Sequence, residues 1–294
     1  MSIPEVLEQF KFERVLSHDT RTKLLHVLGH VGDEAAILTF EKAQYEESEI
    51  PELPKLVQNL TDVVNNNIYG WGSANLASRL PDTRVKMIYP ATEIHIRKYE
   101  AQARYMIAET PAIYEQMTYP YIQAIPTERI QWVQNILNGT SEADRVLFRD
   151  EDPENGFVIL PDMKWDGSVE SLYWVAIAMT NSIYSIRSLG KQHLGLLKNI
   201  RAGAYQLAKE KFGLQERQLR LFVHYPPSYY HFHVHITAVS FMDAPGVTAG
   251  QAHLLDTVID NIELYGDYYQ RATIPMVVGE KFPWYCAHQQ WIEK

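Results

Sequence analysis

The sequence predicts an α+β protein with two domains: a C-terminal antiparallel sheet carrying helices, and a smaller β-rich N-terminal domain. Two observations support this prediction. In the second half, strand-like and helix-like segments are mixed and joined by links of hairpin length, which is typical of helices packed on an antiparallel sheet. The chain has 294 residues, enough for two domains that each bury a core. We expect domains over 1–102 and 103–294.

The N-terminal part is expected to contain strands and loops. Candidate strands cover 10–16, 35–40 and 84–89, and clusters of turn residues separate them at 32–33, 70–72 and 81–82. Near the domain boundary, Tyr99, Ala103 and Met106 recur at four- and three-residue steps, which favours a helix over about 94–118. Such a helix would connect the two domains or act as a hinge.

The second half alternates more clearly between the two patterns. Strand candidates cover 157–160, 173–179, 219–225, 229–240 and 273–278. Apolar residues at three- and four-residue steps predict one helix over 194–207, ending near Gly213, and another over 254–262. This mixture is the basis for expecting an antiparallel sheet covered by helices.

Charge and apolar content exclude several classes of protein. The net charge of −9 argues against a partner such as long nucleic acid, because proteins that grip it usually carry a basic face. The longest apolar run, 172–179, is too short to span a bilayer, and nothing at the start resembles a signal peptide. The single cysteine, Cys286, excludes an intramolecular disulfide. We expect a soluble intracellular protein.

The segment 229–237 holds three histidines at alternate positions. Because side chains of a strand alternate between its two faces, His231, His233 and His235 would project together from one side. An imidazole carries two polar nitrogens that need partners when buried. The histidine face must therefore meet water, a metal or a ligand.

Three interpretations of this strand remain open. Imidazoles two residues apart on a strand can converge on zinc, and a solvated strand without function would show the same alternation. The third is the nucleophile strand of the histidine-triad family of nucleotide hydrolases, which the segment resembles. That family has the pattern His-φ-His-φ-His-φ-φ, where φ is apolar; here only the last position, Thr237, is semi-polar.

The triad interpretation has a chemical basis. Attack on a phosphoric anhydride needs a nucleophile that is neutral near physiological pH and leaves phosphorus easily, and imidazole has both properties. Flanking histidines can donate hydrogen bonds to phosphate oxygens or to the leaving group. The resemblance implies that His233 is the nucleophile, that His231 helps to orient it, and that His235 binds phosphate oxygens or assists the leaving group.

Longer stretches select a group within the triad family. His-Tyr-Pro-Pro-Ser-Tyr-Tyr at 224–230 and Gly-Phe-Val-Ile-Leu-Pro-Asp-Met-Lys-Trp at 156–165 are similar to the scavenger mRNA decapping enzymes. Shorter stretches at 67–69, 89–93, 131–137 and 142–145 extend the similarity over roughly residues 60–265. Because several motifs occur in the same order, the resemblance is specific and implies cleavage of 7-methylguanosine caps.

The resemblance also assigns a cap pocket. Trp132 would stack on the base, Glu142 would bind the guanine edge, Asp162 would contact the nucleoside and Lys164 the triphosphate. Methylation at N7 makes guanine cationic, and a cation over an indole contributes about 0.5–2 kcal/mol, while a carboxylate accepts hydrogen bonds and counters the charge. Taken singly, a helical Trp is usually core and a Glu or Lys usually surface, so only the assembled motifs support these roles.

Three further contacts are implied. His224 and Ser228 match family positions that contact phosphates near the nucleophile, and Asn66 would reach the bound cap from the N-terminal domain. Taken alone, His224 would fit a structural histidine, Ser228 a residue after a strand-breaking Pro-Pro, and Asn66 an Asn-rich turn.

The supply of positive charge is less certain from the sequence. Arg145 and Arg187 are candidate cations that the sequence does not rank. The chain departs from the family at Gln251, where a basic residue is expected just before Ala-His-Leu-Leu. If that position normally holds phosphates, the task falls to Lys164 alone.

As a whole, the resemblance implies hydrolysis of m7GpppN and of short capped oligonucleotides left by 3′-to-5′ mRNA decay. It implies a homodimer, in the cytoplasm and nucleus, whose N-terminal domains exchange segments and close as lids. No metal or cofactor is expected, because histidines and a lysine supply the positive charge. Three alternatives remain. The chain could be another triad hydrolase that acts on dinucleoside polyphosphates, a cap-binding regulator without catalytic activity, or a zinc protein.

Overall fold

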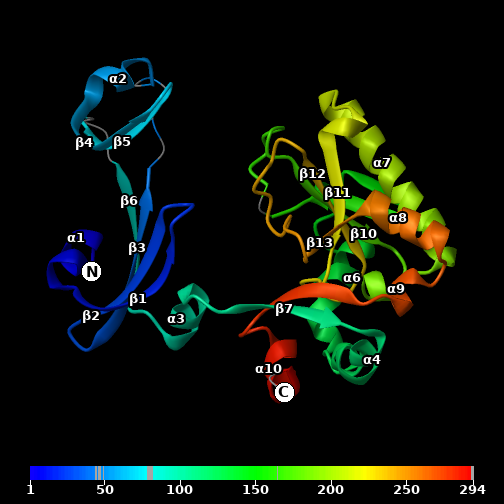
Figure 1. Cartoon of the computed structure of the whole chain (residues 1–294). Helices are drawn as coiled ribbons and strands as arrows, with labels where there is room; N and C mark the ends of the chain where they lie inside the picture. Colours follow the sequence, from blue (N-terminus) through cyan, green and yellow to red (C-terminus); the bar gives the residue numbers. More distant parts are fainter. Residues whose placement is uncertain (44, 46–47, 49, 78–81, 164, 293–294) are drawn as a thin grey trace. The chain divides into compact units, whose positions relative to one another are not determined.

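The computed structural model describes residues 1–294 except 44, 46, 47, 49, 78–81, 164, 293 and 294. It divides into two compact units, Met1–Gln102 and Ala103–Lys294, whose elements are labelled in Figure 1. Both units mix helices with antiparallel strands, which confirms the α+β class. No helix in the described ranges is both long and apolar enough to cross a membrane.

The first unit is built on a four-stranded antiparallel sheet in the order β1-β2-β3-β6. The strands are β1 (Lys11–Asp19), β2 (Leu24–Val31), β3 (Glu34–Lys42) and β6 (Thr83–Ile88). Three of them match the predicted strands, and β2 was not predicted. Helix α1 (Ile3–Gln9) precedes the sheet, where only strands and loops were expected; Ser2 and Glu5 form a capping box that starts it.

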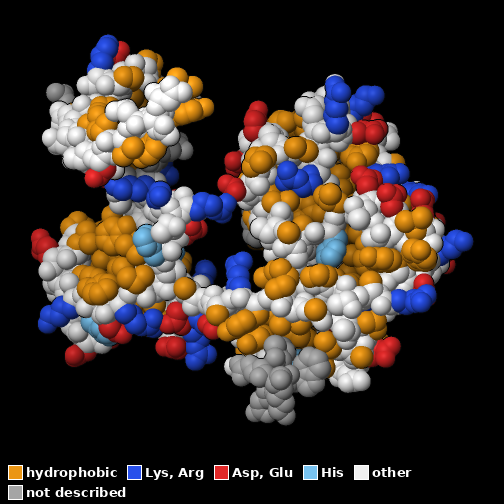
Figure 2. Space-filling model, viewed as in Figure 1, with side chains coloured by type: hydrophobic (Ala, Val, Ile, Leu, Met, Phe, Trp, Pro, Cys, Tyr) orange, Lys and Arg blue, Asp and Glu red, His pale blue; other side chains and the backbone are white. Residues whose placement is uncertain are grey.

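A separate hairpin, β4 (Val57–Asn66) and β5 (Tyr69–Leu76), follows the short helix α2 (Leu53–Leu56). Every residue of both strands is exposed. Many are apolar, and Figure 2 shows such side chains gathered over the hairpin; they are Val57, Leu60, Val63, Val64, Tyr69, Trp71 and Leu76, with Ile68 in the turn. A two-stranded sheet is marginally stable by itself in water, so this hairpin presents a large uncovered apolar surface.

The continuous helix expected over 94–118 is wrong. The chain instead forms helix α3 (Glu93–Tyr99), strand β7 (Arg104–Glu109), and then a helical stretch made of α4 (Pro111–Ile113), a π-helical turn at Tyr114–Thr118 and α5 (Tyr119–Gln123). Strand β7 pairs antiparallel with β14 (Ile274–Gly279). Because that partner lies near the other end of the chain, local periodicity could not reveal it.

The second unit contains a six-stranded antiparallel sheet in the order β13-β11-β12-β10-β9-β8. Its strands are β8 (Phe148–Asp150), β9 (Phe157–Pro161), β10 (Tyr173–Ala178), β11 (Leu219–His224), β12 (His233–Ala238) and β13 (Ala252–Leu254). The helices around it include α6 (Gln131–Leu137), α7 (Leu194–Phe212), α8 (Leu255–Leu264), α9 (Tyr268–Arg271) and α10 (Pro283–Ile292). Helix α7 ends at Gly213, which has a left-handed φ of 68°, as predicted.

The two faces of this sheet pack against different helices. On one face, Trp174, Ala176, Val234 and Ile236 pack with α7 and α8 in the main apolar core, and Figure 1 shows both helices on that side. On the other face, Val158, Leu160, Val175 and Ile177 pack against α6 in a smaller cluster. The smaller cluster covers only part of its face, which leaves room for a site beside it.

Strand β12 is shorter than predicted. A strand was expected over 229–240, but β12 begins at His233. Before it, the Phe232 amide donates to Ile183 and the Phe232 carbonyl accepts from Ala178. These contacts hold residue 232 between the last residue of β10 and the loop that follows it, outside the ladder with β11. His231 therefore precedes the strand that carries His233 and His235.

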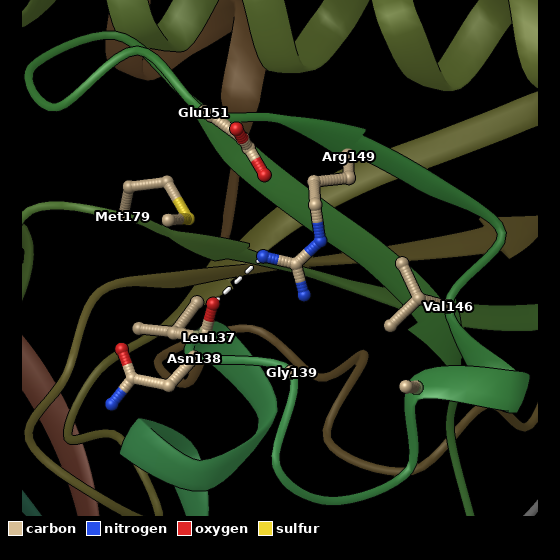
Figure 3. Close-up of a pocket in the computed structure, with 8 residues that line it drawn as sticks. Leu137, Asn138, Gly139, Val146, Arg149, Glu151 and Met179 are labelled. Atoms are coloured by element: carbon tan, nitrogen blue, oxygen red, sulfur yellow. Dashed lines mark hydrogen bonds between the residues drawn. The ribbon is translucent and has the colours of Figure 1, made fainter.

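Helix α6 is held at its C-terminal end by Arg149 from β8. The guanidinium donates to the carbonyls of Leu137 at 2.7 Å and Ile136 at 3.0 Å, and Figure 3 shows it directed at the end of this helix. The last carbonyls of a helix have no partner within the helix. Arg149 satisfies two of them and fixes α6, whose first turn carries Trp132.

Candidate active site

His233 lies at the start of β12 and is 2% exposed. Its Nδ1 is 2.8 Å from the carbonyl oxygen of His231. A carbonyl oxygen can only accept, so Nδ1 carries the proton and Nε2 has a lone pair. Within the described part of the chain, this buried Nε2 has no hydrogen-bond partner. The ring is thus fixed in the tautomer that a phosphorus-attacking imidazole requires.

His231 supports this arrangement through its backbone and its ring. Its Nε2 donates to the Ala178 carbonyl at 2.8 Å, which ties the residue to the end of β10. Its own carbonyl accepts the Nδ1 proton of His233. The expectation that all three histidines project from one strand is therefore incorrect for His231, because β12 begins only at His233 and His231 is tied to the last residue of β10.

His235 faces the same side of the sheet as His233. In the β10–β12 ladder, His233 is opposite Ile177 and His235 is opposite Val175, and the ring centroids of the two histidines are 5.0 Å apart. The Nδ1 of His235 is 3.0 Å from the hydroxyl of Tyr173. His235 is thus held beside the nucleophile by a hydrogen bond from the adjacent strand.

Burial keeps the candidate nucleophile neutral. It lowers the pKa of His233 to about 4, more than the opposing effect of the bond to the His231 carbonyl, and nearby His224 and His231 lower it further. Burial also lowers the pKa of His231. At physiological pH, His233 is therefore uncharged and available to attack.

A cavity of about 390 Å³ opens on this face of the sheet. It brings together six of the predicted site residues: Trp132, Glu142, Asp162, His224, Ser228 and His235. His224 is buried, and its ring centroid lies 4.0 Å from that of His235. The cavity combines an indole, two carboxylates and two imidazoles, a suitable set for a cationic base joined to phosphates.

One end of the cavity holds the residues expected to bind the base. Trp132 is 45% exposed and meets the ring of Tyr229 edge to face, with centroids 4.9 Å apart. Glu142 adopts a left-handed φ of 51° and forms an ion pair with Arg145. Arg145 also donates to the Pro161 carbonyl at 3.1 Å, so it positions the carboxylate of Glu142.

His231 and His233 are not among the residues that line this cavity, although His235 beside them is. Lys164 lies outside the described residues, and Asn66 is an exposed residue at the end of β4 in the first unit. Arg187 is fully buried and pairs with Glu109, Nε to Oε2, at 2.9 Å. It is therefore a structural cation, and of the two candidate arginines it is Arg145 that lines the cavity. Gln251 does line the cavity.

Sequence reasoning missed three residues of the site. Tyr173 lines the cavity and contacts His235, Tyr229 stacks on His233, and the backbone of Gly246 approaches His224 closely. Tyr229 stood inside a recognised motif but was given no role. The position of Tyr173 depends on how β10 pairs with β12, and Gly246 has a left-handed φ of 78°. Only that glycine offered a sequence signal.

The zinc alternative lacks a ligand set among the described side chains, where no three His, Cys, Asp or Glu residues are grouped as metal ligands are. Two of the six nitrogens of the three histidines are already committed to the carbonyls of Ala178 and His231. The arrangement instead suits attack on phosphorus beside a pocket for a base.

Comparison with known proteins identifies the family of this chain. The family model described as scavenger mRNA decapping enzyme (DcpS) N-terminal matches residues 5–102, and the one described as scavenger mRNA decapping enzyme C-term binding matches residues 131–247. Three relatives are each named m7GpppX diphosphatase. The protein of Schizosaccharomyces pombe is 38% identical, covering 94% of this chain and 93% of its own length. The protein of Ascaris suum is 37% identical, covering 95% of this chain and 93% of its own length. The protein of Homo sapiens is 36% identical, covering 93% of this chain and 83% of its own length. The chain belongs to the scavenger mRNA decapping enzyme family.

Proposed function

We propose that the chain hydrolyses m7GpppN and short capped oligonucleotides left by 3′-to-5′ mRNA decay. The products are 7-methylguanosine monophosphate and a nucleoside or oligonucleotide 5′-diphosphate. The observation that carries this proposal is the tautomer of His233, whose Nδ1 bonds to the His231 carbonyl and whose Nε2 keeps its lone pair. Family membership supports the same activity, and the relatives bear the name m7GpppX diphosphatase.

In the first step, Nε2 of His233 attacks the phosphorus that bears methylguanosine. A P–N bond forms, and the anhydride P–O bond breaks towards the departing diphosphate. His235, held by Tyr173 and lining the cavity, hydrogen-bonds the phosphate oxygens or the leaving oxygen. In the second step, water attacks the same phosphorus, the P–N bond breaks, and His233 is restored as 7-methylguanosine monophosphate leaves.

Selectivity for the methylated base comes from the other end of the cavity. The exposed indole of Trp132 stacks on the cationic ring, and Glu142 accepts hydrogen bonds from the guanine edge. Because Arg145 holds Glu142, the carboxylate is positioned before the base arrives. Asp162 lines the same end and contacts the nucleoside. Lys164 and Asn66 retain their expected roles, at the triphosphate and the bound cap, as part of the proposal.

The proposal includes a homodimer. The hairpin β4–β5 exposes the apolar residues Val57, Val63 and Trp71 in a two-stranded sheet, and a second copy of this chain is the partner that would cover them. Light scattering on the purified protein should give twice the mass of one chain. Charged substitutions Val63→Lys and Trp71→Glu should shift it to the monomer, whereas a wild-type monomer would exclude this assembly.

Cap hydrolysis is tested with m7GpppG and its unmethylated counterpart in ¹⁸O-labelled water. We expect m7GpppG to yield labelled 7-methylguanosine monophosphate and unlabelled GDP by mass analysis, and the unmethylated compound to react much more slowly. Equal rates would favour another triad hydrolase. His233→Asn should abolish hydrolysis and retain cap binding; full hydrolysis by this variant would exclude the covalent intermediate, and a wild-type chain that binds without cleaving would be a regulator.

A further inference from the structure

A second cavity of about 390 Å³ adjoins the cap cavity. The two share Trp132, Ser228 and Tyr229 as a common wall. Glu142 and Asp162, the carboxylates expected to bind the nucleoside, line only the first cavity, whereas Trp132 lines both. The second cavity is therefore next to the indole expected to stack on the base but lacks the two carboxylates.

Aromatic rings form much of the second cavity. Tyr121 from α5 and Tyr230 from the loop before β12 both line it, and their rings meet edge to face with centroids 6.2 Å apart. Tyr121 is partly exposed, so part of this residue is accessible to a ligand in the cavity. A half-open tyrosine in a cavity is a typical platform for an unpaired nucleobase, which stacks on it whatever its sequence.

A cation completes the cavity. Arg129 lies in the turn just before α6, lines the cavity and is exposed. It is close enough to Tyr121 to favour the ionised form of that tyrosine, which partly offsets the rise that burial causes in its pKa. Across the part of the chain that the structure describes, Arg129 forms no ion pair, so its charge is available to a phosphate.

We propose that this second cavity binds the RNA side of the substrate: the first nucleoside after the triphosphate on Tyr121, and its 3′ phosphate at Arg129. The inference rests on the proposed function, because the triphosphate must pass the shared wall at Ser228 and Tyr229 to join the two cavities. It makes the chain an enzyme that grips short capped oligonucleotides more tightly than the bare cap dinucleotide.

Two substrates test the inference: m7GpppA, and m7GpppApG, which adds one phosphodiester. Arg129→Ala should lower kcat/KM about two- to fivefold for m7GpppApG, the effect of losing one partly exposed charge contact, and leave m7GpppA unchanged. Tyr121→Leu should lower kcat/KM at least about fivefold for both through loss of stacking, whereas Tyr121→Phe should behave as wild type. Arg217→Ala removes an exposed arginine that lines neither cavity and should change neither substrate.

The binding of products gives a readout that does not require hydrolysis. By titration calorimetry with the full chain, Arg129→Ala should weaken the dinucleotide ppApG about two- to fivefold and leave ADP unchanged. Equal loss for both ligands, or no loss for ppApG, would overturn the assignment of this cavity. A wild-type chain that binds ppApG in this way but cleaves neither cap would contradict the proposed reaction and leave the RNA-binding cavity standing.

Discussion

The ring of Tyr229 lies nearly flat on the ring of His233, with centroids 4.1 Å apart and planes 13° apart. The same tyrosine meets Trp132 edge to face. Tyr229 thus links the residue expected to stack on the base to the candidate nucleophile, and it shields one face of the imidazole from water. A substrate phosphorus that reaches the buried Nε2 must enter beside this ring.

The pH dependence of hydrolysis should reflect the shielded imidazole. Burial lowers the pKa of His233 to about 4, and attack requires the neutral ring. The acid limb of kcat/KM, which reports groups of the free enzyme, should therefore fall near pH 4 and not near the ordinary histidine value of 6.5. Rates measured in a constant-ionic-strength buffer series check this. A midpoint near 6.5 would show that His233 is solvated.

Stability has a related pH dependence with a defined sign. Between 6.5 and about 4, unfolded His233 binds a proton and folded His233 does not, so the unfolded state takes up more protons. The free energy of unfolding should therefore decrease as pH falls through this window, and His233 should contribute no slope above it. Urea unfolding of wild type and His233→Asn at several pH values isolates this contribution, which the variant should lack.

Removing the ring of Tyr229 should expose His233. In Tyr229→Leu, water gains access to the imidazole, so the pKa of His233 should rise from about 4 towards its ordinary value. Tyr229→Phe retains the stacked ring and should keep the pKa low. NMR titration of the histidine ring signals, with His233 identified by its loss in His233→Asn, measures the shift. Identical titrations in both variants would mean that the stack does not control burial.

Gly246 should be required for the position of His224. Its φ is 78°, and an added Cβ would lie 2.2 Å from Nε2 of His224. Gly246→Ala should therefore lower kcat/KM and also cost about 1 kcal/mol for the left-handed backbone. Gly213→Ala is the matched control, because its φ is 68° and nothing lies within 4 Å of the added Cβ. It should lose similar stability with unchanged activity; equal activity losses would deny Gly246 a role in the site.

Much of the sheet was predictable because its strands are regular. Alternation placed His233 and His235 on one face, and the pairing of β12 with β10 has that register. Alternation failed at His231, whose position depends on a hydrogen bond to the carbonyl of Ala178, the last residue of β10, which is distant in sequence. Helical periodicity failed at β7, which is a strand because β14 pairs with it. Contacts between distant segments decide both cases, and no local pattern encodes them.

The residues expected to bind the cap also show what the sequence alone could not predict. Trp132 and Glu142 could be proposed from motifs, and the structure places both in one cavity. The cation of the site could not be chosen, since the sequence did not rank Arg145 and Arg187. Burial separates them: Arg187 is sealed against Glu109, while Arg145 lines the cavity and pairs with Glu142.

The buried pair of Glu109 and Arg187 should dominate the stability of the second unit. Both side chains are fully buried, Nε to Oε2 at 2.9 Å, and Thr118 also donates to Glu109. Glu109→Gln leaves the guanidinium without its counter-charge and should lower the free energy of unfolding by about 3–5 kcal/mol. Asp256→Asn, which breaks the exposed pair with Arg201, should cost only about 0–1 kcal/mol.

The double variant Glu109→Leu/Arg187→Leu should recover much of the loss, because no charge then remains buried. Chemical denaturation followed by tryptophan fluorescence measures all of these variants, and equal costs for the buried and the exposed pair would contradict the expected role of burial.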